Sequence, residues 1–185
     1  MSAPAYFETG ATFGGVGQYR YTLRRRWRVT GECVVCWVML NPSTADAKVD
    51  DPTIRRCVGF SQAWGYDALI VVNLFAVRAP SPKALILRPD FYQSEYEAII
   101  GPENDATIER ETSRAQLVVA AWGNHGALYS RDRDVRNRIE APLHYLGLTK
   151  MNQPRHPLYV SSATKPMEWV RGVASGRIPE GEAKP

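Results

Sequence analysis

Residues 33–46, CVVCWVMLNPSTAD, decide the fold of this chain. The first part, residues 33–40, is apolar almost throughout, which is typical of a strand buried on both faces of a parallel sheet. At Asn41 the pattern changes to a cluster of turn-forming residues with functional side chains. Because open α/β sheets bind ligands where buried parallel strands end in such turns, we expect the functional site directly after this strand.

Two further strands and a helix follow. Asp51 is predicted to cap a helix that has Pro52 at its first position and stops at Gly65. Residues 68–77, ALIVVNLFAV, and 116–122, QLVVAAW, are predicted strands. A strand, a helix and a strand within about 45 residues form a βαβ unit, which makes the two strands parallel.

Shorter elements complete the predicted architecture. We expect helices at 91–100, 104–114 and 131–140, a strand at 144–148 and a last helical turn at 165–170. Residues 1–17 form a loop or an edge hairpin. The predicted fold class is α/β: three α/β/α layers around a mainly parallel sheet of about four strands, plus an N-terminal hairpin.

The composition is that of one ordinary globular domain. The chain has 185 residues, of which 44% are hydrophobic and 23% charged; this suits a single domain at 1–170 with a loose tail at 171–185. The net charge of +4 favours anionic partners mildly. Because we find neither a signal peptide nor an apolar run of membrane-spanning length, we expect a cytoplasmic protein without membrane contact.

The strand at 19–24 and the basic run after it allow two interpretations. Tyr19, Tyr21 and Leu23 alternate with polar residues, as in a strand with one apolar face. Residues 24–28, RRRWR, can contact phosphates, or their charge can protect a solvated edge strand.

The cysteines do not indicate a metal site. Cys33 and Cys36 have C-x-x-C spacing, but in a strand their side chains point to opposite faces. Since no second ligand pair is present, we expect buried, reduced thiols there and at Cys57, and no metal or cofactor.

Polar residues gather where the predicted strands end. Asn73 interrupts an apolar strand, and a buried carboxamide costs free energy unless both of its ends are hydrogen-bonded. It either caps a neighbouring loop or reads a ligand, because an amide offers a donor and an acceptor side by side to a base edge.

Asn41, Asp46 and His156 are the candidates for catalysis. Pro42 fixes an extended backbone at Asn41, so the Asn41 amide is held rigidly and can orient a water or bind a carbonyl. Asp46 can act as a base or a metal ligand. His156 precedes Pro157 in a loop and can present its ring to a ligand.

The chain lacks the Walker loop, G-x-G-x-x-G, G-x-S-x-G and H-E-x-x-H. The residues alone leave two functions open. One is a noncatalytic module that binds nucleic acid or a nucleotide. The other is a metal-dependent phosphohydrolase that uses Asp46, Asp50 and Asp51, since carboxylates suit Mg²⁺.

The motifs LNPSTAD, DDPT, WGY, VVNLFA, AAWG and LGLTK…PRHPLY, in this order, resemble a bacterial and phage family of unknown function over roughly residues 19–160. VMLNPST, VVNLF, VVAAWG and RHPLY are more distantly similar to the uracil-DNA glycosylase superfamily. That resemblance implies the glycosylase-like fold and metal-independent hydrolysis of the N-glycosidic bond of a nucleobase in DNA or a nucleotide. It also implies that Asn41 positions the water, Asn73 reads the flipped base and His156 stabilises charge on the departing base.

The complete predicted site has three groups. The catalytic residues are Asn41, Asp46 and His156; the substrate-binding residues are Pro42, Ser43, Thr44, Asn73, Phe75, Trp122, Gly123, His125, Arg155 and Tyr159; and the nucleic-acid backbone contacts are Arg24, Arg25, Arg26, Arg28, Arg55 and Arg56.

Overall fold

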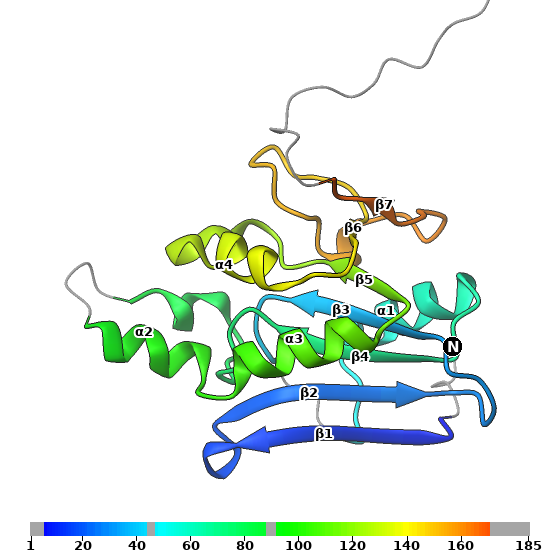
Figure 1. The fold of residues 1–185 in the computed structure, drawn as a ribbon, viewed down its shortest axis with the longest axis horizontal. Coiled ribbons are helices and arrows are strands. Elements are labelled where there is room, and N and C mark those ends of the chain that lie inside the picture. Colours follow the sequence, from blue (N-terminus) through cyan, green and yellow to red (C-terminus); the bar gives the residue numbers. More distant parts are fainter. Residues whose placement is uncertain (1–5, 44–46, 88–91, 171–185) are drawn as a thin grey trace, which may run out of the picture.

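The computed structural model describes residues 6–43, 47–87 and 92–170. One mixed sheet of seven strands forms its centre, in the order β1-β2-β4-β3-β5-β6-β7 (Figure 1). The strands are β1 (Glu8–Gly14), β2 (Tyr19–Arg26), β3 (Val34–Met39), β4 (Ala68–Asn73), β5 (Leu117–Ala120), β6 (Leu143–Tyr145) and β7 (Met167–Glu168). The α-helices are α1 (Pro52–Ala63), α2 (Gln93–Ile100), α3 (Asn104–Arg114) and α4 (Arg131–Arg138), and the 3₁₀ turns are η1 (Gly15–Gly17), η2 (Pro82–Leu85), η3 (Asn124–Ser130) and η4 (Pro157–Tyr159).

The α/β class is confirmed, but the sheet is wider than predicted. Strands β4, β3, β5 and β6 are mutually parallel, while β1, β2 and β7 join antiparallel. The N-terminal hairpin is β1–β2, and it extends the sheet because β2 also pairs with β4. The predicted tail at 171–185 lies outside the described residues, and the single domain at 1–170 stays a prediction.

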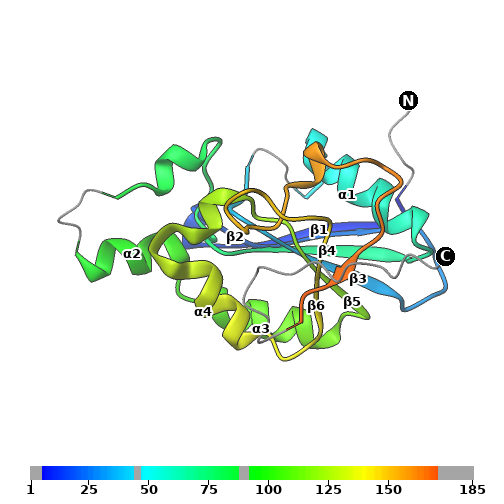
Figure 2. The same ribbon diagram turned by 90° about the horizontal axis from the view of Figure 1, so that it is seen from above.

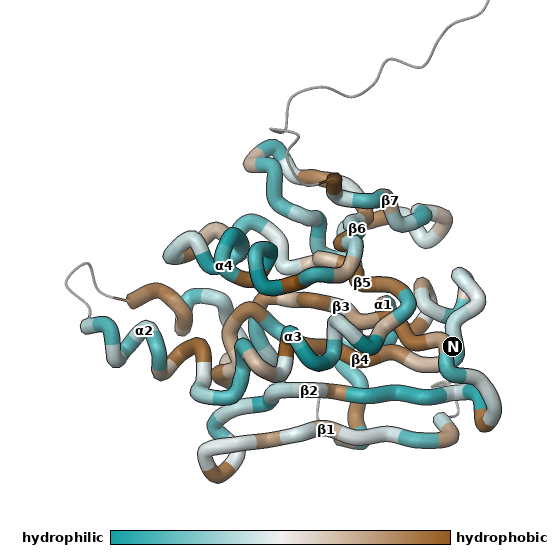
Figure 3. The backbone as a smooth tube through the Cα atoms, in the orientation of Figure 1, coloured by the Kyte–Doolittle hydropathy of each residue, from teal (hydrophilic) through white to brown (hydrophobic). Residues whose placement is uncertain are grey.

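The helices cover both faces of the sheet (Figure 2). Side chains on one face, including Val35, Trp37 and Met39, pack with α1 in one hydrophobic cluster. Those on the other face, including Cys36 and Val38, pack with α3 and α4 in another. Figure 3 shows the resulting apolar centre along β3, β4 and β5. These strands are apolar on both faces because helices cover both.

Helix α1 starts as the sequence predicts. The Asp51 carboxylate accepts a hydrogen bond of 2.8 Å from the Ile54 N–H, and Pro52 occupies the first turn. Gly65 follows the helix with φ of 86°, a conformation that glycine adopts without a steric penalty. The cap therefore fixes where the chain enters α1 from the turn after β3.

Two local predictions were wrong. Within residues 165–170 the chain forms strand β7 (Met167–Glu168) rather than a helical turn, and the Trp169 N–H donates to the Leu143 carbonyl at 2.6 Å. Cys33 is exposed because β3 begins one residue later. Cys36 and Cys57 are buried, and burial raises the pKa of both thiols.

Strand β2 is not an edge strand, and some of its polar residues are buried as well as its apolar ones. It lies between β1 and β4, and Arg20, Thr22 and Arg25 are all buried. The register with β1 pairs Thr12 with Thr22 and Phe13 with Arg20, so it skips Tyr21. Such a bulge interrupts the alternation of side chains.

None of the described helices is long and apolar enough to span a membrane.

Candidate functional site

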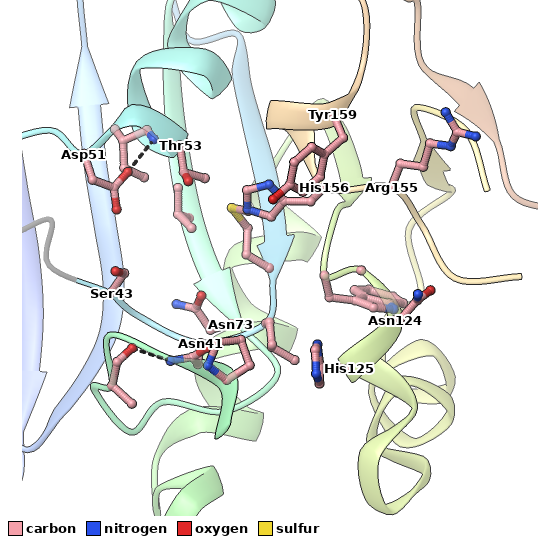
Figure 4. Close-up of a pocket in the computed structure, with 18 of the residues that line it drawn as sticks. Asn41, Ser43, Asp51, Thr53, Asn73, Asn124, His125, Arg155, His156 and Tyr159 are labelled. Carbon is pink, nitrogen blue, oxygen red and sulfur yellow. Dashed lines mark hydrogen bonds between the residues drawn. The ribbon is translucent and has the colours of Figure 1, made fainter. Parts of the chain in front are cut away.

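A cavity of about 650 Å³ opens where β3, β4 and β5 end (Figure 4). Its walls come from the turn after β3, the start of α1, residues 79–82, the start of η3 and residues 149–159. This is the edge of a parallel sheet where ligands are expected. The volume lies within the range of about 300–1,000 Å³ that is typical of small-molecule sites.

Most of the predicted binding and catalytic residues come together here. Those that line the cavity are Asn41, Ser43, Asn73, Trp122, Gly123, His125, Arg155, His156 and Tyr159. Pro42 is buried behind the wall, where its carbonyl accepts from the Ala79 N–H at 3.0 Å. Phe75 is fully buried and packs edge-on against Tyr129 instead of lining the cavity. Thr44 and Asp46 lie outside the described residues.

Two backbone carbonyls hold the Asn41 amide in place. Its Nδ2 donates to the carbonyls of Pro42 (3.1 Å) and Ala79 (2.9 Å). Because a carbonyl oxygen only accepts hydrogen bonds, the atom of the Asn41 amide that faces both carbonyls is its nitrogen and not its oxygen. Oδ1 is therefore the group that Asn41 can offer to the cavity, and it is a rigidly held acceptor.

Asn73 offers the complementary group. Its side chain is 1% exposed and lines the cavity, and its Nδ2 has no hydrogen-bond partner among the described residues. A buried donor without a partner costs about 1–3 kcal/mol. Among the described residues this nitrogen caps no neighbouring loop, and the ligand-reading role stays a prediction.

A polar network behind the cavity holds the end of β4. Asn104 Nδ2 donates to the carbonyls of Asn73 and Leu74, both at 3.0 Å. Arg131 Nε donates to the same Leu74 carbonyl at 2.9 Å, and its guanidinium pairs with Asp105. These contacts use the backbone of Asn73, so its side chain is free to serve the cavity.

His156 presents a neutral imidazole. Its Nδ1 accepts a long hydrogen bond of 3.4 Å from the Leu158 N–H, which places the ring proton on Nε2. Burial lowers the pKa of His156 below its ordinary value, and the Asp51 carboxylate opposes this shift. The ring is therefore an uncharged Nε2–H donor near neutral pH.

Arg56 fixes the loop that carries His156. From α1, its Nε donates to the Pro157 carbonyl at 3.3 Å and its Nη2 donates to the Val160 carbonyl. Its guanidinium also lies over the Phe60 ring, 4.8 Å from the centroid. The predicted phosphate contact is thus a structural link between α1 and η4.

Trp122 forms a fixed wall of the cavity. Its Nε1 donates to Gln153 Oε1 at 2.7 Å, and Gln153 Nε2 donates to Asp132 Oδ2 at 3.0 Å. The ring passes so close to Gly126 that a Cβ there would lie 2.0 Å from Trp122 Cδ1. Only glycine fits beneath this ring.

The other arginines that were predicted to contact phosphates also have partners within the protein. Arg24 pairs with Glu111 (3.0 Å), Arg25 with Asp50 (2.8 Å), Arg26 with Glu8 (3.8 Å) and Arg28 with Asp67 (3.2 Å), and Arg55 donates to the Asp50 carbonyl (2.6 Å). The basic stretch of β2 stands out in Figure 3 as hydrophilic, yet acidic partners compensate its charge.

The carboxylates proposed for a metal site have other partners. Asp50 bonds to Arg25 and to the Tyr6 hydroxyl, and Asp51 caps α1. Within 6–43, 47–87 and 92–170, no three His, Cys, Asp or Glu side chains gather as a metal site would require. Asp51 also lines the cavity, so it is the carboxylate that the described residues place there.

Sequence reasoning missed several lining residues. Arg20, Thr53 and Lys150 line the cavity without having been predicted, as do Asn124 and Thr149, whose side chains share a hydrogen bond of 2.6 Å. Strict alternation of side chains along β2 did not predict that Arg20 lines the cavity, because the bulge at Tyr21 changes the face of the strand on which Arg20 lies. The motif LGLTK, by contrast, does contain Thr149 and Lys150.

Comparisons with curated proteins and with solved structures find no match. A family model described as "Protein of unknown function (DUF1643)" matches residues 20–158, which include the four parallel strands and every cavity-lining residue except Tyr159. The match agrees with the expectation of an uncharacterised family, and the chain belongs to this family of proteins of unknown function.

Proposed function

We propose that the cavity binds a nucleobase and that the protein hydrolyses the N-glycosidic bond of a nucleoside unit. The observation that carries the proposal is the Asn73 Nδ2–H₂ group, which is buried in the cavity wall and has no hydrogen-bond partner among the residues that the structure describes. A base carbonyl would complete its hydrogen bonding. The four parallel strands and the cavity at their carboxyl ends support the resemblance to the uracil-DNA glycosylase superfamily.

Asn41 and His156 suit the two partners of the displacement, the attacking water and the departing base. Asn41 Oδ1 is a fixed acceptor that can hold the attacking water, and His156 Nε2–H is a donor for the departing base. Water adds to C1′ while the C1′–N bond breaks; the bonding pair leaves with the base, and the base gains the proton that the water loses. Preorganised donors stabilise such a developing anion in a site that excludes water.

A carboxylate can stabilise the charge that develops on the sugar. Asp51 lines the cavity, and a negative charge there stabilises the positive charge that develops at C1′. Asp46, the predicted base, lies outside the described residues and keeps its proposed role at the water.

The test is base release, followed by chromatography and mass spectrometry. The panel contains nucleosides, nucleoside 5′-monophosphates, and DNA single strands and duplexes that carry one uracil, mismatched or modified base. Wild type is compared with Asn41→Ala, Asn73→Leu and His156→Asn, with chelator present throughout. Asn137→Ala, an exposed site on α4, is the matched control.

We expect release of a base from at least one class of substrate, a loss of at least about 100-fold in the three cavity variants, and no change in the control. No release from any substrate would contradict the hydrolase and, if binding persists, leave a noncatalytic module. Release that the chelator abolishes would contradict the metal-independent mechanism.

A further inference from the structure

The basic run of β2 lies at the wrong edge of the sheet to bind phosphates beside the cavity. Strand β2 is antiparallel to β4, and Arg26 pairs with Ala68, the first residue of β4. The cavity adjoins Asn73, the last residue of β4. Residues 24–26 therefore lie beside the amino end of β4, away from the cavity, and phosphates near the cavity need another basic segment.

Four charged side chains of the described residues line the cavity, and they divide into an inner pair and an outer pair. Arg20 is buried and Asp51 is partly buried, so the inner pair carries one charge of each sign. Lys150 and Arg155 are both exposed and both cationic. The net charge of the lining is therefore positive, and it resides on the exposed side chains, where it can attract an anion from solvent.

A hairpin at residues 147–155 carries both outer cations. The Thr149 N–H donates to the Gln153 carbonyl at 2.8 Å, and Thr149 Oγ1 donates to Asn124 Oδ1 at 2.6 Å, which ties the hairpin to the start of η3. Lys150 lies in the turn between Thr149 and Gln153. Because the hairpin backbone is already fixed, little of it has to be ordered when a ligand binds.

The Arg155 guanidinium is oriented by the backbone and still has donors to offer. Its Nε donates to the Leu148 carbonyl at 3.0 Å, while its two terminal nitrogens have no hydrogen-bond partner among the described residues. Figure 4 shows the Arg155 side chain directed away from Asn41 and Asn73. The terminal nitrogens can thus bind a phosphate outside the cavity, in the two-pronged geometry that arginine favours.

Tyr159 adds an exposed aromatic surface to the cavity lining. The residue is 77% exposed, and its ring centroid lies 5.8 Å from that of His156. Exposed aromatic rings beside basic groups are typical of proteins that bind single-stranded nucleic acid, because bases stack on the rings while the phosphates follow the cations. A duplex, whose bases are already stacked, would offer no free base to this ring.

We infer that Lys150, Arg155 and Tyr159, together called the rim, bind a nucleic-acid strand with unpaired bases. One base enters the cavity, the phosphates beside it contact Lys150 and Arg155, and a neighbouring base stacks on Tyr159. The opposed charges of Arg20 and Asp51 suit an uncharged base inside the cavity better than a phosphate. The inference rests on the proposed function, since the base in the cavity is the one whose N-glycosidic bond is hydrolysed.

Equilibrium binding tests the rim separately from the hydrolase, because binding needs no turnover. Fluorescence anisotropy follows labelled DNA and RNA oligonucleotides of mixed sequence, single-stranded and duplex, between about 50 and 200 mM salt. The proteins are wild type, Lys150→Met, Arg155→Met, Tyr159→Leu and the control Arg133→Met, which removes one charge from an exposed position on α4. Nucleoside 5′-monophosphates compete with the strand for wild type, so this arm does not depend on the folding of a variant.

Wild type should bind a single strand at least about tenfold more tightly than the duplex or a monophosphate. Lys150→Met and Arg155→Met should each weaken binding about three- to tenfold. Each should also reduce the slope of log K against log salt by about 0.7, the value for one phosphate contact of a single strand. Tyr159→Leu should weaken binding about fivefold or more and leave the slope unchanged, because stacking involves no counterion.

Strand affinity that neither Lys150→Met nor Arg155→Met changes, or that Arg133→Met lowers equally, would overturn the inference. Monophosphates or duplexes that bind as tightly as single strands would also overturn it. Base release from free nucleosides by a protein that binds no strand would overturn the inference and leave the hydrolase standing. Strand binding that depends on the rim but gives no base release would support the inference and refute only the hydrolase.

Discussion

At the scale of single residues, Asn73 combines a functional group with a cost in stability. Its buried Nδ2 has no partner in the described part of the chain, and its backbone carbonyl is held independently by Asn104. Replacing the amide by an apolar group of similar shape should therefore stabilise the fold while it removes ligand recognition. Active sites commonly show this trade-off.

Asn73→Leu should raise the free energy of unfolding by about 1–2 kcal/mol, because the orphan donor disappears. Urea unfolding followed by tryptophan fluorescence measures the change. A loss of stability of similar size would show that the Asn73 amide has a structural role instead.

His156 gives a pH-dependent prediction. Burial lowers its pKa from the ordinary 6.5, so the unfolded chain binds a proton more readily than the folded one. Stability should therefore fall as the pH decreases from about 6.5 through the lowered pKa, and should be unaffected by His156 above this window.

The variant His156→Asn isolates this effect, since asparagine can still accept from the Leu158 N–H as an N-cap. Thermal unfolding between about pH 5 and pH 8 should decline less steeply on the acid side in the variant than in wild type. Identical pH profiles would rule out the lowered pKa.

At the scale of elements, Arg56 connects α1 to the loop that carries His156. Arg56→Met removes two donors to the carbonyls of Pro157 and Val160 but keeps the aliphatic stem over Phe60. Amide hydrogen exchange at residues 158–160 should become at least about tenfold faster, a loss of about 1.4 kcal/mol or more in local stability.

Arg55→Met on the same helix is the control, because Arg55 points to the Asp50 carbonyl rather than to this loop. Unchanged exchange at 158–160 in Arg56→Met, or equal acceleration in both variants, would refute the link.

The sequence predicted the elements near the site well where local rules govern them. The cap at Asp51, the stop at Gly65 and the strand that ends before Asn41 follow from local chemistry, and the structure contains all three. The bulge at Tyr21 could not be predicted, because it depends on pairing with β1 rather than on residues near it in the chain. Arg20 was missed for this reason.

At the scale of the whole molecule, Arg25 of β2 holds the fold together instead of contributing to an external basic surface. Arg25 is fully buried, pairs with Asp50 and donates to the Ala47 carbonyl at 3.2 Å. It thus ties the sheet to the segment that leads into α1. A count of charges in the sequence could not show this, because ion pairing depends on residues far apart in the chain.

Arg25→Met should lower the free energy of unfolding by about 3–5 kcal/mol, since it leaves the Asp50 carboxylate without its guanidinium partner. Arg28→Met, which changes a mostly exposed arginine, should have a small effect. Urea denaturation compares the two variants, and equal stability would contradict a structural role for Arg25.

The central claim is that the Asn73 amide recognises a nucleobase in the cavity. The most direct measurement is the ¹⁵N–¹H resonance of the Asn73 side chain during titration with nucleoside monophosphates, with Asn73→Leu providing the assignment. We expect one Nδ2 proton to move downfield in a saturable manner with at least one monophosphate as its new hydrogen bond forms. Saturable binding that shifts other amides but leaves this resonance in place, or no binding at all, would contradict it.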